Sequence, residues 1–373
     1  MKIVYCLQNS LIEKVLLKNK VINKRSHIVR SKKELSLDYL EKINPDYIMF
    51  PHWSYIVPEK IFTKYKCICF HSAPLPFGRG GSPIQNMISL GFKHTEVCSL
   101  LMEKDLDAGP IFFRTKVKLN GSLDDILERI YVVISAQIKQ FKKKKKISPK
   151  TQKGKVVKFK RLSYKDNFID FHMEREKVYD KIRMLDSNLY PSALSNQGNY
   201  FIHFGNAKFK KDHIESSVKI TRKVKLRRAN IRDARDIWEW RNDPLTRSMF
   251  LNSDFIEFKE HRDWFAKKLS NKNCFCYIGE TFSMKSGVVR FDINRKSAEV
   301  SINVNPKFRG LSISQTLLKD SISDFYLKSK IPNLVANVKE NNKPSIRLFE
   351  SLGFEYCAKN KKLLTYRLNI EKK

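Results

Sequence analysis

The chain has 373 residues, enough for two domains, and its 42% hydrophobic content can supply a core for each of them. Its 73 Lys and Arg against 38 Asp and Glu give a net charge of +35, which favours anionic partners such as phosphates, nucleic acid or a membrane surface. A lysine bias spread along the chain explains this charge equally well. No apolar run reaches the length of a membrane span, and the N-terminal run is too short for a signal peptide, so we expect no membrane insertion.

Residues 1–141 alternate between strand-like and helix-like segments. Strands are predicted at Ile3–Cys6, His27–Arg30, Tyr47–Phe50 and Cys67–Phe70, and helices at Leu11–Leu17 and Leu35–Ile43. Such alternation predicts an α/β, Rossmann-like domain in which helices cover a parallel sheet and functional residues follow the carboxyl ends of strands.

Two further helix starts are encoded in this first domain. Ser82 stands before Pro83, with Gln85 placed for a capping box, which predicts a helix beginning at Pro83. Another helix is predicted to open at Ser122–Asp125, because the apolar residues that follow recur on one helical face.

Five consecutive lysines, Lys142–Lys146, open a polar segment that we predict to be a basic linker over residues 142–160. A run of this kind is usually solvated and self-repelling, although nucleic-acid binding stays open as an alternative.

A small subdomain is predicted for residues 161–215, with strands at Tyr200–Phe204 and Ala207–Phe209. A second boundary falls near residues 215–221. The α/β pattern then restarts, which predicts another domain over residues 219–373.

Seven cysteines occur in the chain, with two Cys-x-Cys pairs but no Cys-x-x-Cys and no histidine cluster at zinc spacing. We therefore expect no metal site and a reduced, cytoplasmic protein whose thiols are buried.

A histidine and an aspartate in the first domain could converge into an acyl-transfer site. His71 directly follows a predicted strand and opens a Pro- and Gly-rich loop that runs to Gln85, and Asp107 lies in a turn 36 residues further on. Transfer to an amine requires removal of a proton and stabilisation of an oxyanion. His71 can act as the base or, protonated, as the oxyanion donor, and Asp107 can orient it.

The segments Phe70–Gln85 and Leu106–Gly109 resemble the 10-formyltetrahydrofolate-dependent formyltransferases, a family that includes methionyl-tRNA formyltransferases and sugar N-formyltransferases. The resemblance covers about residues 1–210. It implies that His71 and Asp107 are catalytic and that the loop packs beside the folate and the formyl group through Gly80, Gly81 and Pro83.

One position departs from this family, which usually has asparagine two residues before the histidine. Cys69 stands there, and a thiol is a weaker hydrogen-bond donor than an amide. We place Cys69 in the catalytic group, with Gln85 or Asn86 as candidate substitutes for the missing amide. The alternative is a formyltransferase domain that binds its substrate without chemistry.

The segment after the linker favours one branch of the family. Only about 55 residues follow it before the next domain, and Lys181–Asp186 with Tyr190–Ala193 resembles the short tail of the sugar-nucleotide branch. Arg183 is the candidate phosphate contact, since guanidinium matches phosphate geometry. Trp53, just after a strand, either flanks the same cleft or fills the core.

A second set of signals lies near the other end of the chain. Residues 299–314 predict a strand, a loop with Arg309, and a helix from about Ser312 to Lys328, whose first amides suit a pyrophosphate. Residues 341–354 predict another helix, with an asparagine cap, an early proline and a stop at Gly353.

In this order the two segments resemble the GNAT acetyltransferases over about residues 219–370, with the nucleotide-sugar acetyltransferases of pseudaminic-acid pathways as the best match. The resemblance implies acetyl-CoA as the donor, with Asn342 near its pantetheine or acetyl end. It also implies a pyrophosphate loop made of Arg309, Gly310, Ser312 and Ser314.

Four residues of the GNAT-like region bear on its chemistry. Ser312 and Ser314 stand where glycine or alanine is usual, and Phe349 stands where many members have the tyrosine that protonates the leaving thiolate, so the general acid stays unassigned. Glu299 is the candidate base, acting directly or through water, and a solvent-facing strand residue is an equally good interpretation.

The combined prediction is a bifunctional cytoplasmic enzyme that uses 10-formyltetrahydrofolate and acetyl-CoA to acylate amino-sugar nucleotides of a surface-glycan pathway. This prediction includes no nucleic acid among the partners, and it leaves open whether the protein forms a homodimer. The alternative is a modifier of macromolecules that formylates methionyl-tRNA or acetylates protein N-termini.

Overall fold

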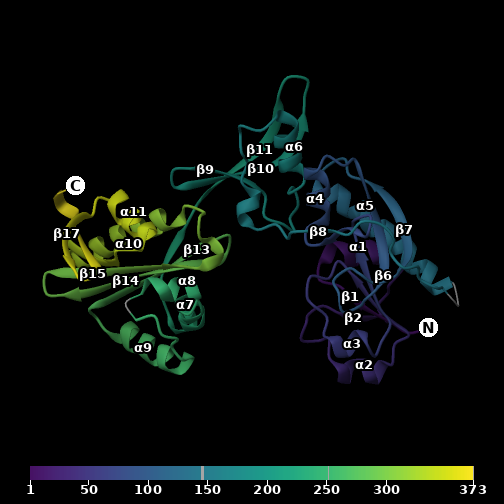
Figure 1. Ribbon diagram of the computed structural model, residues 1–373, viewed down its shortest axis with the longest axis horizontal. Helices are drawn as coiled ribbons and strands as arrows, with labels where there is room; N and C mark the ends of the chain where they lie inside the picture. Colours follow the sequence, from purple (N-terminus) through teal and green to yellow (C-terminus); the bar gives the residue numbers. More distant parts are fainter. Residues whose placement is uncertain (144–146, 251, 373) are drawn as a thin grey trace. The chain divides into compact units, whose positions relative to one another are not determined.

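The computed structural model describes residues 1–143, 147–250 and 252–372 (Figure 1). The chain forms two compact units. The first contains residues 1–195 and 202–219, and the second contains residues 196–201 and 220–373. The two units are described separately below.

The first unit is built on a six-stranded sheet in the order β2-β1-β3-β4-β6-β7. Its strands are β1 (Ile3–Cys6), β2 (His27–Val29), β3 (Tyr47–Pro51), β4 (Cys67–His71), β6 (His94–Leu101) and β7 (Ile111–Lys118). The first four strands in this order are parallel, as the alternating pattern predicted. The last two are antiparallel, so the sheet is mixed rather than wholly parallel.

Helices cover both faces of this sheet. The helices are α1 (Ser10–Lys18), α2 (Leu37–Ile43), α3 (Glu59–Phe62), α4 (Pro83–Ser89) and α5 (Leu123–Lys143). One core contains buried side chains of α1, α4 and α5, such as Leu16, Ile84 and Ile126. The other contains Leu40 of α2 and Ile61 of α3. The predicted helices of this region are therefore confirmed.

The predicted basic linker is only partly a linker. Helix α5 continues through Lys143, and the Nζ of Lys142 donates a hydrogen bond to the carbonyl of Val21, so this lysine is not part of a free solvated run. Further along, β8 (Val157–Phe159) pairs in parallel with β5 (Phe77–Gly80). Residues 144–146 of the lysine run lie outside the described residues.

A three-stranded sheet in the order β11-β10-β9 follows, with helix α6 beside it (Figure 1). The elements of this region are η1 (Tyr164–Asn167), α6 (Arg175–Arg183), β9 (Ala193–Gln197), β10 (Tyr200–Phe209) and β11 (Ile214–Arg222). The two short strands predicted at 200–204 and 207–209 form one continuous strand, β10.

The second unit contains a seven-stranded sheet in the order β12-β13-β14-β15-β16-β18-β17, in which only β15 and β16 are parallel neighbours. Its strands are β12 (Lys225–Arg228), β13 (Cys274–Thr281), β14 (Met284–Asn294), β15 (Ser297–Val304), β16 (Asn333–Lys339), β17 (Glu355–Asn360) and β18 (Leu363–Asn369).

Helices lie on both sides of the central strands of this sheet (Figure 1). The longer ones are α7 (Ala234–Arg241), α8 (Pro244–Met249), α9 (Phe258–Ser270), α10 (Ile313–Ser329) and α11 (Lys343–Ser351), and the single turns are η2 (Ile231–Asp233), η3 (Pro306–Phe308) and η4 (Ile370–Lys372). In the figure, α10 and α11 lie on one side of β14 and β15, and α7 and α9 lie on the other.

The turn between β9 and β10 belongs to the second unit, although it precedes the predicted boundary at residues 215–221. Phe201 is fully buried and stacks on Phe282, with ring centroids 5.1 Å apart. Asn199 accepts a hydrogen bond from the backbone N–H of Lys223. A single boundary in the sequence therefore does not separate the two units.

Within the described residues, no helix combines the length and the apolar character needed to cross a membrane. The same part of the chain holds no cluster of three or more His, Cys, Asp or Glu side chains arranged for a metal ion. All seven cysteines are free thiols, and only Cys357 is exposed.

Candidate functional site

His71 is the last residue of β4, at the carboxyl end of a parallel strand. Alternation along the strand puts Cys67, Cys69 and His71 on one face of the sheet. The imidazole is 8% exposed, so its contacts are made largely away from solvent.

The two ring nitrogens of His71 face different partners. Nε2 lies 2.7 Å from the carbonyl oxygen of Gly78, and Nδ1 lies 3.4 Å from Oδ2 of Asp107. A carbonyl oxygen only accepts hydrogen bonds, so Nε2 carries a proton in this contact. The ring nitrogen that can exchange a proton with a substrate is therefore Nδ1, which faces the carboxylate of Asp107.

Asp107 stands in a strained turn between β6 and β7. Its φ of +54° is in the left-handed region, and its Oδ2 accepts a hydrogen bond of 3.0 Å from the backbone N–H of Gly80. One carboxylate oxygen thus contacts both the imidazole and the glycine-rich loop. The structure brings together the histidine and the aspartate whose convergence the sequence predicted.

Gln152 anchors the Asp107 turn and was not singled out by the sequence. Its Nε2 donates to the carbonyl oxygens of Asp107 (2.8 Å) and Gly109 (2.9 Å), while its Oε1 accepts from Nε and Nη2 of Arg79. Gln152 lies in the segment interpreted as a linker. Two long-range contacts bring that segment to the site, namely the pairing of β8 with β5 and the antiparallel bridge between Lys150 and Ile111.

The glycines of the loop make close contacts with other parts of the protein. A Cβ on Gly80, whose φ is +109°, would lie 2.5 Å from the carbonyl oxygen of Phe159, and a Cβ on Gly81 would lie 2.4 Å from Cβ of Arg161. These glycines therefore allow the segment around β8 to approach, and folate contact is not needed to explain them.

The start of α4 differs from the predicted capping box. The helix begins at Pro83 as predicted, but Ser82 has a φ of +50° and makes no side-chain cap. Its hydroxyl accepts instead from the backbone N–H of Leu162. The side-chain amide of Asn86 donates to the carbonyls of Gly81, Ser82 and Lys160, so it is already engaged and does not replace the missing asparagine.

Cys69 is held as a neutral thiol. Burial, and next the negative charge of Asp107, raise its pKa well above the usual value. Its Sγ lies 3.8 Å from the carbonyl oxygen of Leu100. The sulfur is therefore a weak donor beside the imidazole, not a nucleophilic thiolate.

Trp53 packs in the core on the Cys69 face of the sheet. Its ring makes edge contacts with Phe50 (5.9 Å) and Tyr55 (5.4 Å), which agrees with the core-filling alternative. Its indole Nε1 is nevertheless buried without a hydrogen-bond partner in the described part of the chain. A ligand carbonyl could satisfy this donor, so a substrate contact stays a proposal.

Arg183 makes protein contacts in place of the predicted phosphate contact. Its side chain is buried, it forms a 2.6 Å ion pair with Asp180, and Nη1 donates to the carbonyls of Leu119 and Gly121. The guanidinium therefore holds the end of α6 against the loop that precedes α5. Its position at the end of an amphipathic helix gave no sign of these backbone acceptors.

A second histidine, His52, lies just after β3 with a φ of +56°. Its Nδ1 lies 2.7 Å from the hydroxyl of Tyr131, and its Nε2 lies 2.9 Å from the hydroxyl of Tyr190. Burial, with a smaller contribution from Arg161, lowers the pKa of His52 to about 4. The ring is therefore neutral near pH 7 and ties β3 to α5 and to the segment before β9.

In the second unit, β15 and β16 separate after three residue pairs, the last of which joins Glu299 and Val335. Residues 300–304 remain paired with β14 on their other side, so their backbone is unpaired toward β16. Glu299 stands where the two strands part. Its Oε1 accepts a 3.1 Å hydrogen bond from Nδ2 of Asn337, and its side chain is exposed.

The helix start after this opening has the geometry that the sequence predicted to bind pyrophosphate. Helix α10 begins at Ile313, directly after Ser312, whose φ of +55° explains why glycine suits this position. Gly310 also has a positive φ, of 78°, and Ser314 is the second residue of the helix. The first amides of this 17-residue helix have no partner within the helix.

Arg309 and Asn342 are committed to protein contacts in this structure. Nη2 of Arg309 donates to Oδ1 of Asp243 at 2.7 Å and to the hydroxyl of Thr246, so part of its charge is balanced at the start of α8. The side-chain oxygen of Asn342 accepts from the backbone N–H of Ser345 and caps α11. Contacts of either residue with a coenzyme stay proposals.

Three family models match the chain. Residues 8–145 match the formyl transferase model, residues 164–221 match the C-terminal domain of methionyl-tRNA formyltransferase, and residues 223–355 match the acetyltransferase (GNAT) domain. The solved structure of methionyl-tRNA formyltransferase from Clostridium thermocellum is 36% identical, covers 60% of this chain and 99% of its own length, and has a TM-score of 0.57. The chain belongs to the formyltransferase family. It also carries a GNAT domain.

Two curated relatives of the chain are methionyl-tRNA formyltransferases. Methionyl-tRNA formyltransferase from Thermotoga neapolitana is 32% identical over 169 residues, which are 43% of this chain and 54% of that protein. The enzyme of the same name from Thermotoga maritima is 31% identical over 177 residues, 45% and 56% of the two chains. The chain thus spans about half the length of these relatives.

Proposed function

We propose that the first unit transfers a formyl group from 10-formyltetrahydrofolate to an amine. The observation that carries this proposal is the buried pair of His71 and Asp107 at the carboxyl end of β4. In the transfer, the bond between the amine nitrogen and the formyl carbon forms, the bond between that carbon and N10 breaks, and a proton from the amine ends on N10.

The residues of the site divide these tasks by geometry. The Nδ1 edge of His71, next to Asp107, takes the proton of the attacking amine and returns it to the leaving nitrogen. The carboxylate orients the ring and balances the charge that it acquires. Cys69 offers only a weak donor to the formyl oxygen, so we expect slower formyl transfer than an asparagine at this position would give.

The site offers chemistry that fits a formyl-bearing folate. The unpartnered indole N–H of Trp53 can serve a ring carbonyl, and Tyr55 and Ile56 beside it are exposed apolar side chains that can cover a flat ring system. His71 and Asp107 would then face the formyl group.

For the second unit we propose acetyl transfer from acetyl-CoA. Its residues fit this coenzyme, because the unpaired backbone of residues 300–304 can bond the pantetheine amides and the start of α10 presents free N–H groups to the pyrophosphate. The N–C bond of an amide forms, the C–S bond of the thioester breaks, and the amine proton ends on the sulfur of CoA. Glu299 is the proposed base.

The proposed acceptor of both reactions is an amino-sugar nucleotide of a surface-glycan pathway, handled in the cytoplasm. The short region after β8, with the turn η1, helix α6 and one three-stranded sheet, agrees with the resemblance to the sugar-nucleotide branch, although residues 164–221 also match the C-terminal domain of methionyl-tRNA formyltransferase. The excess of lysine and arginine also suits phosphate-bearing substrates.

The test is to incubate the full chain with a UDP-linked 4-amino sugar and each acyl donor separately, and to follow the product by mass spectrometry. We expect the mass of one formyl group to be added with one donor and that of one acetyl group with the other. His71→Gln should abolish only formyl transfer, and Cys69→Asn should accelerate it. No gain of mass with either donor would overturn the proposal.

Formylation of methionyl-tRNA is the second candidate, favoured by the name of the matched relatives. It predicts that methionyl-tRNA is formylated and that tRNA binding weakens steeply with salt, because phosphate contacts release counterions. Formylation of the tRNA but not of the amino sugar would select this candidate.

A further inference from the structure

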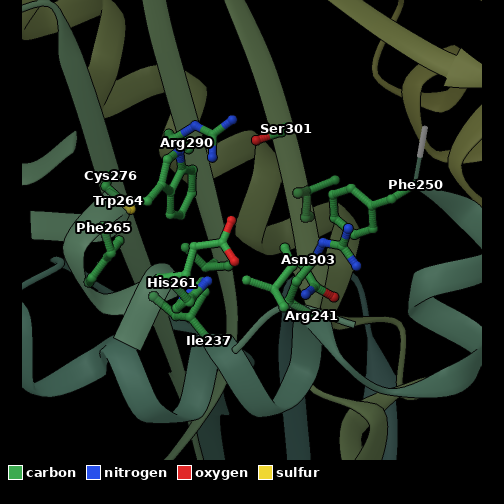
Figure 2. Close-up of a pocket in the computed structure, with 14 residues that line it drawn as sticks. Ile237, Arg241, Phe250, His261, Trp264, Phe265, Cys276, Arg290, Ser301 and Asn303 are labelled. Atoms are coloured by element: carbon green, nitrogen blue, oxygen red, sulfur yellow. The ribbon is translucent and has the colours of Figure 1, made fainter. Parts of the chain in front are cut away.

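A cavity of about 340 Å³ lies in the second unit between helices α7 and α9 and the strands β13, β14 and β15. Most of its wall is apolar, with Ile237, Phe265 and Val288 among the lining residues. Figure 2 shows Arg241 and Arg290 at different places in this lining, with Trp264 next to Arg290.

Arg241 lines the cavity with a donor that no described residue accepts. The side chain is 9% exposed, Nη2 donates to the carbonyl of Asn252, and the guanidinium lies over the ring of Phe250, with its carbon 4.3 Å from the centroid. Nη1 is buried and has no hydrogen-bond partner among the residues that the structure describes. A buried charged donor without an acceptor is costly, so the arrangement is explained by a ligand acceptor.

Arg290 contributes a second guanidinium to the same cavity. Its Nε donates to Asp292 at 2.7 Å, and its guanidinium carbon lies 5.0 Å from the centroid of Trp264. The Trp264 side chain is 38% exposed, so one flat aromatic surface stays accessible beside a cation. Aromatic rings stack on such a surface, and phosphates pair with such a cation.

The remaining ionisable groups of the lining do not cancel the two arginines. Burial, followed by the charge of Arg241, lowers the pKa of His261 to about 4, so this ring is neutral near pH 7. Its Nε2 also lacks a partner within the described residues. Glu260 is the one acidic residue of the lining, and it is exposed. The lining therefore carries two guanidinium groups against one carboxylate, and Asp292, the partner of Arg290, is shared with Lys268.

Strand β15 connects the wall of the cavity with the proposed acetyl-transfer position at Glu299. Ser301 and Asn303 line it, and alternation along the strand puts them on the same face as Glu299. Across the β14–β15 pairing, Arg290 lies opposite Ser301. A molecule held by the arginines can thus direct an amine along β15 toward the point where β15 and β16 separate.

We propose that this cavity binds the acetyl acceptor, and that the acceptor carries a phosphate and a flat ring, as a nucleoside diphosphate does. Arg241 and Arg290 bind the phosphate, and Trp264 stacks on the ring. This inference rests on the proposed acetyl transfer and identifies how its acceptor is recognised. A polyamine would meet two arginines and a single exposed carboxylate. A peptide amino group would supply no acceptor for Nη1 of Arg241, which has none among the described residues.

The test uses the full chain and UDP as the probe, with binding measured by calorimetry. Arg290→Gln and Trp264→Leu, both at partly exposed side chains, should each weaken UDP binding about tenfold or more. Lys267→Gln is the matched control, because it removes a charge from an exposed position of α9 outside the lining. Arg241→Gln should act like Arg290→Gln, provided that it folds.

Acetyl-CoA binding, measured on the same variants, separates this inference from the proposed function. Unchanged acetyl-CoA affinity with weakened UDP binding in the cavity variants supports the inference. The inference is overturned if Arg290→Gln and Trp264→Leu both bind UDP as tightly as Lys267→Gln does. It is also overturned if spermidine or an acidic dipeptide binds in the cavity and UDP does not. Failure of the unaltered chain to bind acetyl-CoA overturns instead the proposed acetyl transfer.

Discussion

Gln152 offers the sharpest test of how the formyl-transfer site is held. Its side-chain amide donates two hydrogen bonds, to the carbonyls of Asp107 and Gly109. At about 0.5–1.5 kcal/mol for each bond, Gln152→Ala should cost the Asp107 turn about 1–3 kcal/mol. If that cost appears in the transition state, kcat for formyl transfer falls about 5- to 150-fold with little change in KM.

Two variants separate the donors from the acceptor of this amide. Gln152→Glu keeps an oxygen for Arg79 but replaces the N–H donors with a carboxylate, so we expect it to lose at least as much activity as Gln152→Ala. The exposed neighbour Thr151 provides the matched control, as Thr151→Ala. Steady-state formyl transfer is the assay, and acetyl transfer by the same chain is the internal control. A folded Gln152→Ala protein with unaltered kcat would refute the positioning role.

Three further predictions concern single positions. Gly109→Ala should abolish formyl transfer, because an added Cβ would lie 1.9 Å from the carbonyl oxygen of Leu101; a fully active variant would show that this turn can move. Phe201→Ala should lower the free energy of unfolding of the second unit by about 3–5 kcal/mol in urea titrations, since the ring is fully buried, and a loss under about 1 kcal/mol would contradict the assignment. The pKa of His52 is lowered from 6.5 to about 4, so between these two pH values the unfolded chain binds a proton that the folded chain does not. The free energy of unfolding should therefore fall by up to about 1.4 kcal/mol per pH unit as the pH drops from 6.5 to 4. His52→Gln should remove this part of the slope in pH-dependent unfolding, whereas the exposed His94→Gln should leave it in place.

Local sequence patterns predicted the elements that carry the candidate sites. Strand β1 has the predicted bounds Ile3–Cys6, and α4 begins at Pro83 as expected, because hydrophobic periodicity and the position of proline act over a few residues. The meeting of His71 and Asp107 also followed from position, since each comes at the end of a strand or in a turn at the same edge of the sheet.

Contacts between distant segments were beyond reach of the sequence. Gln152 reaches the Asp107 turn because β8 pairs with β5 and Lys150 bridges to Ile111, and no local signal in a lysine-rich stretch indicates either contact. Arg183 has the residue type of a phosphate contact, but its burial depends on carbonyl acceptors more than 60 residues away. Ser82 matched a capping box by spacing, yet its positive φ directs the hydroxyl to Leu162.

The β9–β10 turn has a consequence for how this chain can be divided. The path of the chain passes from the first unit to the second at residue 196, returns at residue 202, and passes over again at residue 220. A gene cut at any one codon between these points therefore cannot encode two complete proteins. An acetyltransferase fragment that starts at residue 220 would lack Phe201, which stacks on Phe282. Recombination that exchanges the acetyltransferase alone would have to preserve this hexapeptide inside the formyltransferase gene segment.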